Sequence, residues 1–211
     1  TPPKTQAAML EAMQEKQVSV GNMKYALEQP FFVLATQNPI EQEGTYNLPE
    51  AQLDRFMYKL VVDYPETRDE IEVLRRTTTN YQDTPQSVLK GEDILKYQRM
   101  LREVLVRDDL YDYVVRLVQA TRVSKDYSLP FAKEWVAWGA GPRACQNLIL
   151  GAKAHAFFNG RSHATTADIR TVAKPVLRHR VIVNYAAIAE NISSDKVVEK
   201  VLEAVPAPEA V

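Results

Sequence analysis

The sequence has little of what marks several specialised classes of protein. It contains one cysteine, Cys145, so no internal disulfide can form, which fits a reducing cytoplasmic compartment. Its longest apolar runs, such as residues 31–35, fall far short of the roughly 20 residues that cross a bilayer. We therefore expect a cytoplasmic protein without a membrane span.

An excess of charge of either sign is also missing. The chain carries 26 Lys and Arg against 27 Asp and Glu, a net charge of −1. Proteins whose main task is to grip nucleic acid through its phosphates usually show a basic excess, so nucleic acid is not an expected partner. The three histidines, His155, His163 and His179, lack metal-ligand spacing, and no metal site is expected.

The seven glycines include no G-x-x-x-x-G-K-[ST] run, so the chain shows no phosphate-binding loop. No acidic pair ends a strand ahead of the first helix, and no magnesium-binding motif is visible. The chain starts at Thr1 without an initiator methionine and leads directly into a helical pattern. We interpret it as a fragment of a longer protein.

The first part of the sequence, residues 1–64, mixes helical and strand patterns. A Gly21-Asn22 turn between two alternating runs predicts a hairpin, and a continuous apolar run indicates a strand buried on both faces. The expected elements are a helix over 5–15, a hairpin over 18–27, a strand over 31–35, a helix over 49–55 and a strand over 58–63. This order predicts an α/β fold with a parallel sheet, present in part.

From residue 65 onward the periodicity becomes helical, which predicts an all-α domain over 65–211 with a linker or long loop at about 77–91. Thr165 and Asp168 have the spacing of a helix capping box. The expected helices cover 66–76, 92–106, 109–122, 142–158, 166–179 and 194–204.

Asn38 is the first candidate site residue, because it closes the polar run that follows the predicted strand at 31–35. Ligands in α/β sheets bind beyond the carboxyl ends of strands. An Asn side chain both donates and accepts, which suits orienting a water against a phosphate. A turn that begins at Asn38-Pro39 is the plainer alternative, and spacing alone favours it.

Arg55 is the second candidate, at the end of a predicted short helix and just before a strand. Such an arginine commonly caps carbonyls or pairs with a neighbour, here Asp54. The functional alternative is an arginine finger that reaches into the nucleotide site of a neighbouring subunit.

Arg143 is the third candidate, because Pro142 fits the first position of a helix and puts Arg143 in the first turn. A cation there faces the positive end of the helix dipole, at a cost of about 0.3–1 kcal/mol. A nearby anion would reverse the sign, which favours a phosphate-binding role. By contrast, the basic residues 178–180 suit a helix C-terminus, where cations complement the dipole.

Four segments together resemble the MoxR family of AAA+ ATPases. They are TQNPIEQEGTY at 36–46, LPEAQLDRF at 48–56, GPRA at 141–144, and VLRHR at 176–180 with Gly160-Arg161 ahead of it. The resemblance extends over almost the whole chain. Asn47 and Gly141 depart from the residues common at those positions, and neither change removes a functional group.

The resemblance implies a role for each candidate. Asn38 would be sensor 1 and Arg143 sensor 2, on the phosphates of ATP bound to the same subunit. Arg55 would be the arginine finger, acting on the next subunit, and the hairpin at 18–27 would be the pre-sensor 1 insertion. Residues 2–6 match the segment that follows the Walker B motif.

The family likeness also implies ATP hydrolysis with Mg²⁺, both bound mainly by segments missing from this chain, so the fragment alone should be inactive. It implies a homo-oligomeric ring that is a hexamer by family analogy, chaperone-like remodelling of partner proteins, and a von Willebrand factor A domain protein as one partner. Two alternatives stay open. One is a non-catalytic helical interaction or DNA-binding module. The other is a magnesium-chelatase-like or helicase-like ring, over which the motif at 37–44 favours the MoxR family.

Overall fold

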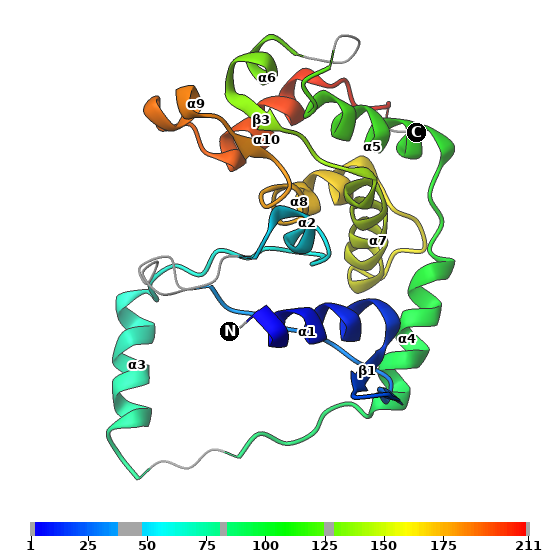
Figure 1. Cartoon of the computed structure of the whole chain (residues 1–211), viewed down its shortest axis with the longest axis vertical. Helices are drawn as coiled ribbons and strands as arrows, with labels where there is room; N and C mark the ends of the chain where they lie inside the picture. Colours follow the sequence, from blue (N-terminus) through cyan, green and yellow to red (C-terminus); the bar gives the residue numbers. More distant parts are fainter. Residues whose placement is uncertain (1–2, 38–47, 81–83, 125–128, 210–211) are drawn as a thin grey trace.

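The computed structural model describes residues 3–37, 48–80, 84–124 and 129–209. Its elements fall into two regions along the chain (Figure 1). The first region contains α1 (Pro3–Glu15), β1 (Gln17–Val20), β2 (Met23–Ala26), α2 (Glu50–Leu53), α3 (Thr67–Thr77) and α4 (Gly91–Glu103). The second contains α5 (Asp108–Ala120), α6 (Pro130–Trp135), β3 (Val136–Trp138), α7 (Pro142–Phe158), α8 (Thr166–Leu177), β4 (Ile182–Val183), α9 (Tyr185–Ala189) and α10 (Ser194–Ala204).

The predicted hairpin is present as β1 and β2, which pair antiparallel with Val20 opposite Met23. Gly21 closes the turn at a φ of +61°, in the left-handed region. No atom lies near a Cβ placed on Gly21, so the backbone conformation and not crowding favours glycine there.

The predicted parallel sheet does not form among the described residues, whose sheets are both two-stranded and antiparallel. Residues 31–35 and 58–63 are extended but belong to no strand. Phe32 and Leu34, expected in a buried strand, are 78% and 82% exposed. An apolar run shows that a segment suits a sheet, but a strand also needs a neighbouring backbone to pair with.

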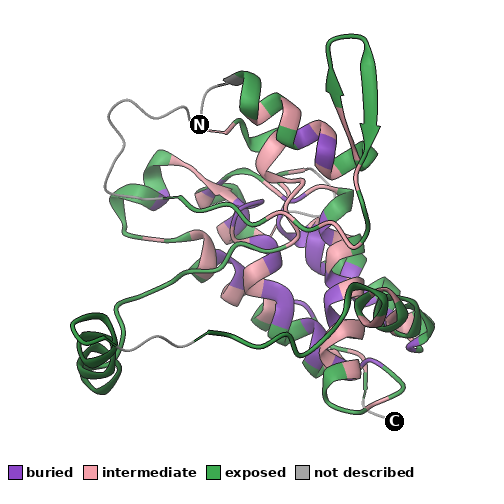
Figure 2. Ribbon diagram, turned by 90° about the horizontal axis from the view of Figure 1, so that it is seen from below, coloured by how far each residue is buried: buried purple, intermediate pink, exposed green. Residues whose placement is uncertain are grey.

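The second region contains the hydrophobic core. Helices α5, α7, α8 and α10 meet there, and Figure 2 shows their facing surfaces as buried. The largest fully buried side chains include Tyr113, Leu117, Leu148, Ile169 and Leu177. Burying each such side chain stabilises the fold by about 1.5–3 kcal/mol, so this region has its own source of stability.

The second region is not all-α as predicted. β3 pairs antiparallel with β4, with Val136 opposite Val183, and the short helices α6 and α9 flank this sheet in sequence. Strands of two or three residues are too short to show an alternating pattern, and these two lie more than forty residues apart in the chain. Only the folded chain brings them together.

α3 confirms the helix expected at 66–76, yet it has no buried residue. Figures 1 and 2 show it apart from the other helices, at the end of long connections. An ion pair of 2.8 Å between Arg76 and Glu72, four residues apart, lies along its surface. No helix within the described residues is long and apolar enough to cross a membrane.

Candidate functional site

Arg55 lies in a tight turn that follows α2 and covers residues 54–57, called the Arg55 turn below. The Arg55 and Phe56 amides donate to the carbonyls of Gln52 and Leu53, which continues the helical path for one further turn. Arg55 Nε is shielded from solvent and has no hydrogen-bond partner among the described residues. Arg55 Nε therefore keeps an unused donor, and the ion pairs of Asp54 among the described residues are with Arg143 and Arg180 rather than with Arg55.

Asp54 instead binds two arginines from the second region. Its Oδ2 lies 3.1 Å from Arg143 Nη1, and its Oδ1 lies 2.9 Å from Arg180 Nε. Arg143 is in the first turn of α7, as predicted, where a cation is disfavoured by the helix dipole. The anion that offsets this penalty in the structure is the carboxylate of Asp54.

The start of α7, and with it Arg143, is held against the end of α5. Thr121 Oγ1 accepts a hydrogen bond from the Ala140 amide at 2.9 Å, and Arg122 Nε donates to the Ala140 carbonyl at 2.9 Å. A Cβ on Gly139 would lie 2.4 Å from the Thr121 carbonyl oxygen. Glycine is therefore needed for the close approach that sets the direction of α7.

Arg180 and His179 fasten the turn around Arg55 to the end of α8. The Arg180 side chain is 0% exposed, and its guanidinium donates to backbone carbonyls of residues 54, 56 and 57. His179 Nε2 lies 3.1 Å from the Phe56 carbonyl oxygen, which can only accept, so this nitrogen carries the proton. Burial and the nearby Arg180 charge lower the pKa of His179 to about 4.

Residues just after this turn lie on α7 and α8. The Lys59 amide donates to the Pro175 carbonyl at 2.9 Å. The Tyr58 hydroxyl sits where Gly151 leaves room on α7, because a Cβ there would lie 2.3 Å from it. Burial raises the pKa of Tyr58. Together these contacts place α2 and the Arg55 turn beside α7 and α8, as Figure 1 shows.

A second charged cluster centres on Asp168, whose side chain is 1% exposed. Burial alone would raise the pKa of Asp168, but hydrogen bonds from Arg161, His155 and Thr165 together hold it below its ordinary range. The predicted capping box is confirmed, since Asp168 accepts from the Thr165 amide at 2.7 Å. Every partner lies within the second region, so this cluster stabilises the start of α8.

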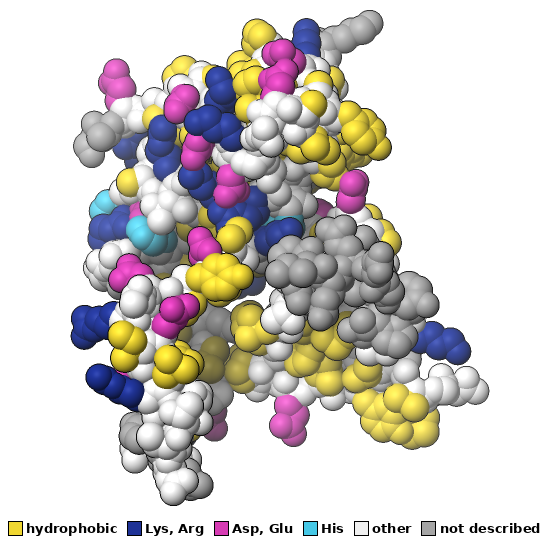
Figure 3. Space-filling model, turned by 90° about the vertical axis from the view of Figure 1, so that its left-hand side faces the viewer, with side chains coloured by type: hydrophobic (Ala, Val, Ile, Leu, Met, Phe, Trp, Pro, Cys, Tyr) yellow, Lys and Arg dark blue, Asp and Glu magenta, His cyan; other side chains and the backbone are white. Residues whose placement is uncertain are grey.

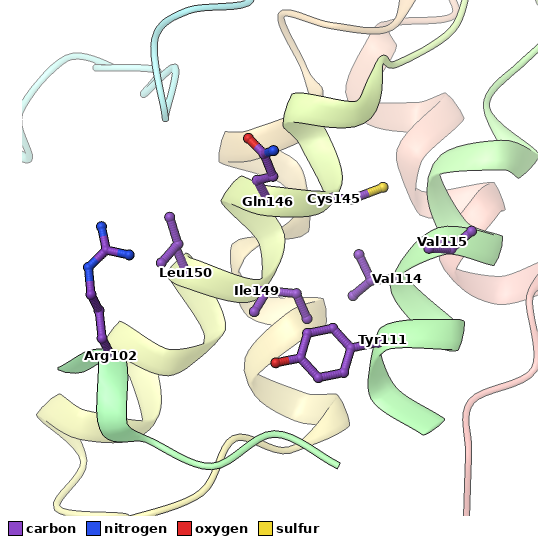
Figure 4. Close-up of a pocket in the computed structure, with 8 residues that line it drawn as sticks. All are labelled: Arg102, Tyr111, Val114, Val115, Cys145, Gln146, Ile149 and Leu150. Carbon is purple, nitrogen blue, oxygen red and sulfur yellow. The ribbon is translucent and has the colours of Figure 1, made fainter. Parts of the chain in front are cut away.

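An apolar hollow of about 480 Å³ lies between α4, α5 and α7 (Figure 4). Tyr111, Val114 and Val115 of α5 face Cys145 and Ile149 of α7 across it. Cys145 is half-buried, and burial raises the pKa of its thiol. Arg102 is the one ionic side chain of this lining, so the hollow suits an apolar group better than a phosphate.

The structure joins two of the three predicted site residues at one corner. Arg55 and Arg143 meet through Asp54, whereas Asn38 lies outside the described residues. Within the described ranges, no group of three or more His, Cys, Asp and Glu side chains could hold a metal ion. Figure 3 shows Lys and Arg side chains gathered over the upper part of one face, with acidic side chains between them.

Arg180 is the site residue that sequence reasoning missed. The run at 178–180 was expected to complement a helix dipole, and its spacing does not show that the middle of the chain folds back onto it. The contact joins residues 126 positions apart. The only sequence signal was that Asp54 and the basic run at 178–180 both belong to segments that carry the family resemblance.

Comparison with known proteins connects this arrangement to one family. Residues 1–58 match the model of the ATPase family associated with various cellular activities (AAA), and residues 131–201 match the AAA lid domain. The chaperone MoxR1 of Mycobacterium tuberculosis is 42% identical over 99% of this chain. The chain belongs to the MoxR family of AAA+ ATPases.

Two further relatives agree with this MoxR-family assignment. The uncharacterized protein YeaC of Bacillus subtilis is 38% identical over 99% of the chain. A crystal structure of a candidate ATPase from Cytophaga hutchinsonii superposes with a TM-score of 0.91, at 44% identity over 99% of the chain. The chain spans 55% of MoxR1, 62% of YeaC and 63% of the crystallised protein.

The family assignment confirms the predicted fold class in its main outline, an AAA+ core segment followed by a lid domain. The β1–β2 hairpin and the Arg55 turn lie in the part that matches the AAA family. Arg143, His179 and Arg180 lie in the lid. The domain boundary at residue 65 stays a prediction, because it falls between the two matched segments.

Proposed function

We propose that this chain completes an ATP-hydrolysing site at the boundary between subunits of a MoxR-type AAA+ ring. The observation that carries the proposal is that Arg55 lies in a turn held to the lid by Arg180, and that its neighbour Asp54 pairs with Arg143 and Arg180, so Arg55 has no ion-pair partner among the described residues. An arginine supplied by a neighbour stabilises the charge that develops during phosphoryl transfer.

Arg55 is the arginine finger in this proposal. Such a residue is worth about 10³–10⁵ in rate, which corresponds to about 4–7 kcal/mol of barrier at 1.36 kcal/mol per tenfold. A penalty of that size far exceeds what any surface ion pair of the chain contributes. Loss of the finger should therefore lower turnover far more than loss of a surface ion pair.

Arg143 is the second phosphate ligand, as sensor 2. Its side chain is 46% exposed, and an ion pair of that kind contributes about 0–1 kcal/mol. Arg143 can therefore leave Asp54 for a phosphate at small cost, while Arg180 continues to neutralise the Asp54 carboxylate. The exchange makes Arg143 responsive to bound nucleotide.

The position of Arg143 also bears on which subunit it serves. Asp54 joins it to the turn that carries Arg55, so both arginines lie at one corner of the molecule. If Arg55 faces the neighbouring subunit, the simplest arrangement has Arg143 facing the same nucleotide. We therefore replace the expectation that Arg143 acts within its own subunit by the proposal that both act across the boundary.

The remaining assignments rest on the family. Asn38 would orient the attacking water, and ATP with Mg²⁺ would be held mainly by parts of the protein outside this chain. A ring, hexameric by family analogy, would work in the cytoplasm as a chaperone-like remodeller of partner proteins, including a von Willebrand factor A domain protein. The relative MoxR1 is named a chaperone, which supports this direction.

The decisive experiment is Arg55→Ala in the full-length protein. We expect turnover to fall by about 10³-fold or more, while the dissociation constant for ATP changes by about twofold at most. Arg75→Ala on α3 is the matched control, because Arg75 is an exposed arginine whose ion pair is a 3.9 Å contact with Glu72. Unchanged turnover in Arg55→Ala would refute the assignment.

A further inference from the structure

Arg180 makes more polar contacts with the Arg55 turn than any other described residue of the lid. Its Nε donates to Asp54 Oδ1 at 2.9 Å, and its Nη2 donates to the carbonyl oxygens of Asp54 and Phe56 at 2.8 and 2.6 Å. Its Nη1 donates to the Met57 carbonyl at 3.2 Å. These acceptors lie on both sides of Arg55 in sequence.

The geometry of this contact suits positioning. A guanidinium group is planar and presents its donors in a fixed fork, so several acceptors at once define the orientation of the turn. Arg180 Nη1 also donates to the Val176 carbonyl at the end of α8, which ties the same side chain to the lid. The Arg180 side chain is 0% exposed, so water does not compete for these bonds.

We propose that Arg180 is a positioning residue that sets the direction of the arginine finger from the lid of its own subunit. The proposal rests on the proposed role of Arg55. Arg180 does not touch the nucleotide; it acts through Asp54 and the carbonyls around Arg55. A movement of the lid is thereby carried to the finger that serves the neighbouring subunit.

Asp54 makes this connection sensitive to nucleotide. Its carboxylate is shared, with one oxygen on Arg180 and the other on Arg143. When Arg143 leaves for a phosphate, Arg180 becomes the remaining described ion-pair partner of Asp54. The turn then depends on Arg180 alone for its attachment through Asp54, at the stage of the cycle when the finger is needed.

The test uses Arg180→Lys in the full-length protein. Lysine keeps the charge but cannot reach four acceptors as a planar fork. A displacement of about 1 Å from the productive geometry costs about 10²-fold in rate, so we expect kcat to fall by about that factor. KM for ATP should change by about twofold at most, because the residue does not contact substrate.

Mixed rings separate a positioning role in the neighbour's site from a role in the same subunit. Arg55→Ala subunits retain an intact site of their own and lack only the finger that they would donate. Mixed with Arg180→Lys subunits, they should recover no activity, because neither partner donates a well-placed finger. Recovery would overturn the proposal, since it would show that the Arg180→Lys subunit still donates a working finger.

Subunits with a disabled phosphate-binding loop provide the positive control for mixing. Combined with Arg55→Ala subunits, they should restore activity, because they donate an intact finger to an intact site. Arg178→Lys is the matched control for the lid, since Arg178 pairs with Asp195 and reaches Lys59 but bonds to none of residues 54–57. Its kcat should stay within about twofold of the wild type.

Asp54→Asn carries the same test if Arg180→Lys prevents assembly. Asp54 is 25% exposed, and the amide keeps the size of the side chain and an oxygen for Arg180. We expect a smaller loss of kcat and again no recovery with Arg55→Ala. Wild-type kcat in both variants would overturn the proposal, whereas wild-type turnover in Arg55→Ala would instead refute the finger itself.

Discussion

The two regions of the molecule are held together by different physical means. Among the described residues up to Glu103, the buried hydrophobic side chains are Leu10 and Ala12. From Val104 to Val205 a continuous core runs through the lid helices. The lid is therefore stabilised by the burial of apolar surface, whereas the Arg55 turn is attached to the lid largely by hydrogen bonds from Arg180 and His179.

This difference explains which region would set the geometry of the site. Apolar packing is strong but non-directional, while a hydrogen bond contributes only about 0.5–1.5 kcal/mol and depends on direction. The lid supplies a well-packed support, and Arg180, just after α8, holds the Arg55 turn at a defined angle. Substitutions in the buried core of the lid should change stability, and substitutions in the Arg55 turn and of the residues that hold it should change turnover.

The largest effect on stability is expected for Asp168→Asn. The change removes the charge of a buried carboxylate that accepts hydrogen bonds from Arg161, His155 and Thr165. Each hydrogen bond to a charged group contributes about 1.5–3 kcal/mol. Urea unfolding would measure the loss. Asp195→Asn is the control, because Asp195 is 34% exposed in its pair with Arg178 and its loss should cost about 1 kcal/mol or less. Equal costs would contradict the contrast between core and surface.

Acid should weaken the attachment of the turn through His179. Its pKa is about 4 in the folded protein, against about 6.5 when unfolded. The unfolded state binds more protons between these values, so stability is complete above pH 6.5 and falls by up to about 3 kcal/mol as the pH drops to 4. Arg180 and Lys59 oppose protonation, and Asp54 favours it.

His179→Gln tests this pH dependence, because the amide can still donate to Phe56 but does not titrate. The free energy of unfolding of the variant should lose that part of its fall between pH 7 and pH 4.5. His163→Gln, at an exposed histidine, should keep the wild-type profile. A wild-type profile in His179→Gln would show that this histidine does not govern the acid response.

Gly139→Ala should destabilise the start of α7. The new Cβ would lie 2.4 Å from a backbone oxygen, and overpacking of this kind costs about 1–3 kcal/mol. Gly141→Ala is the matched control, since a Cβ there meets nothing within 4 Å. Thermal unfolding compares the two variants, and a melting temperature as high for Gly139→Ala as for Gly141→Ala would argue against the close approach.

The smallest effect is expected in the first region, for Glu72→Ala on α3. The change removes the ion pairs with Arg75 and Arg76, all at exposed side chains. Exposed helix pairs contribute about 0.3–0.5 kcal/mol each, so urea unfolding should shift by less than about 1 kcal/mol. A larger loss would mean that α3 packs against something that its exposure does not reveal.

Local patterns were sufficient for much of the fold. The hairpin closed by Gly21, the capping box of Thr165 and Asp168, and the start of α7 at Pro142 all appear where the sequence predicts them. Each depends on residues within a few positions of one another. Residues 31–35 and 58–63 failed as strands because pairing depends on a second segment, which their own composition does not specify.

By itself, the sequence determined the family, the helical lid and the presence of Arg55 and Arg143 as candidates. Only the tertiary structure decided that Asp54 joins Arg143 to the Arg55 turn and that Arg180 fastens this turn to the lid. The reason is physical. Helix propensity and capping act over a few residues, whereas a buried charge finds its partners only after the core has brought distant segments together.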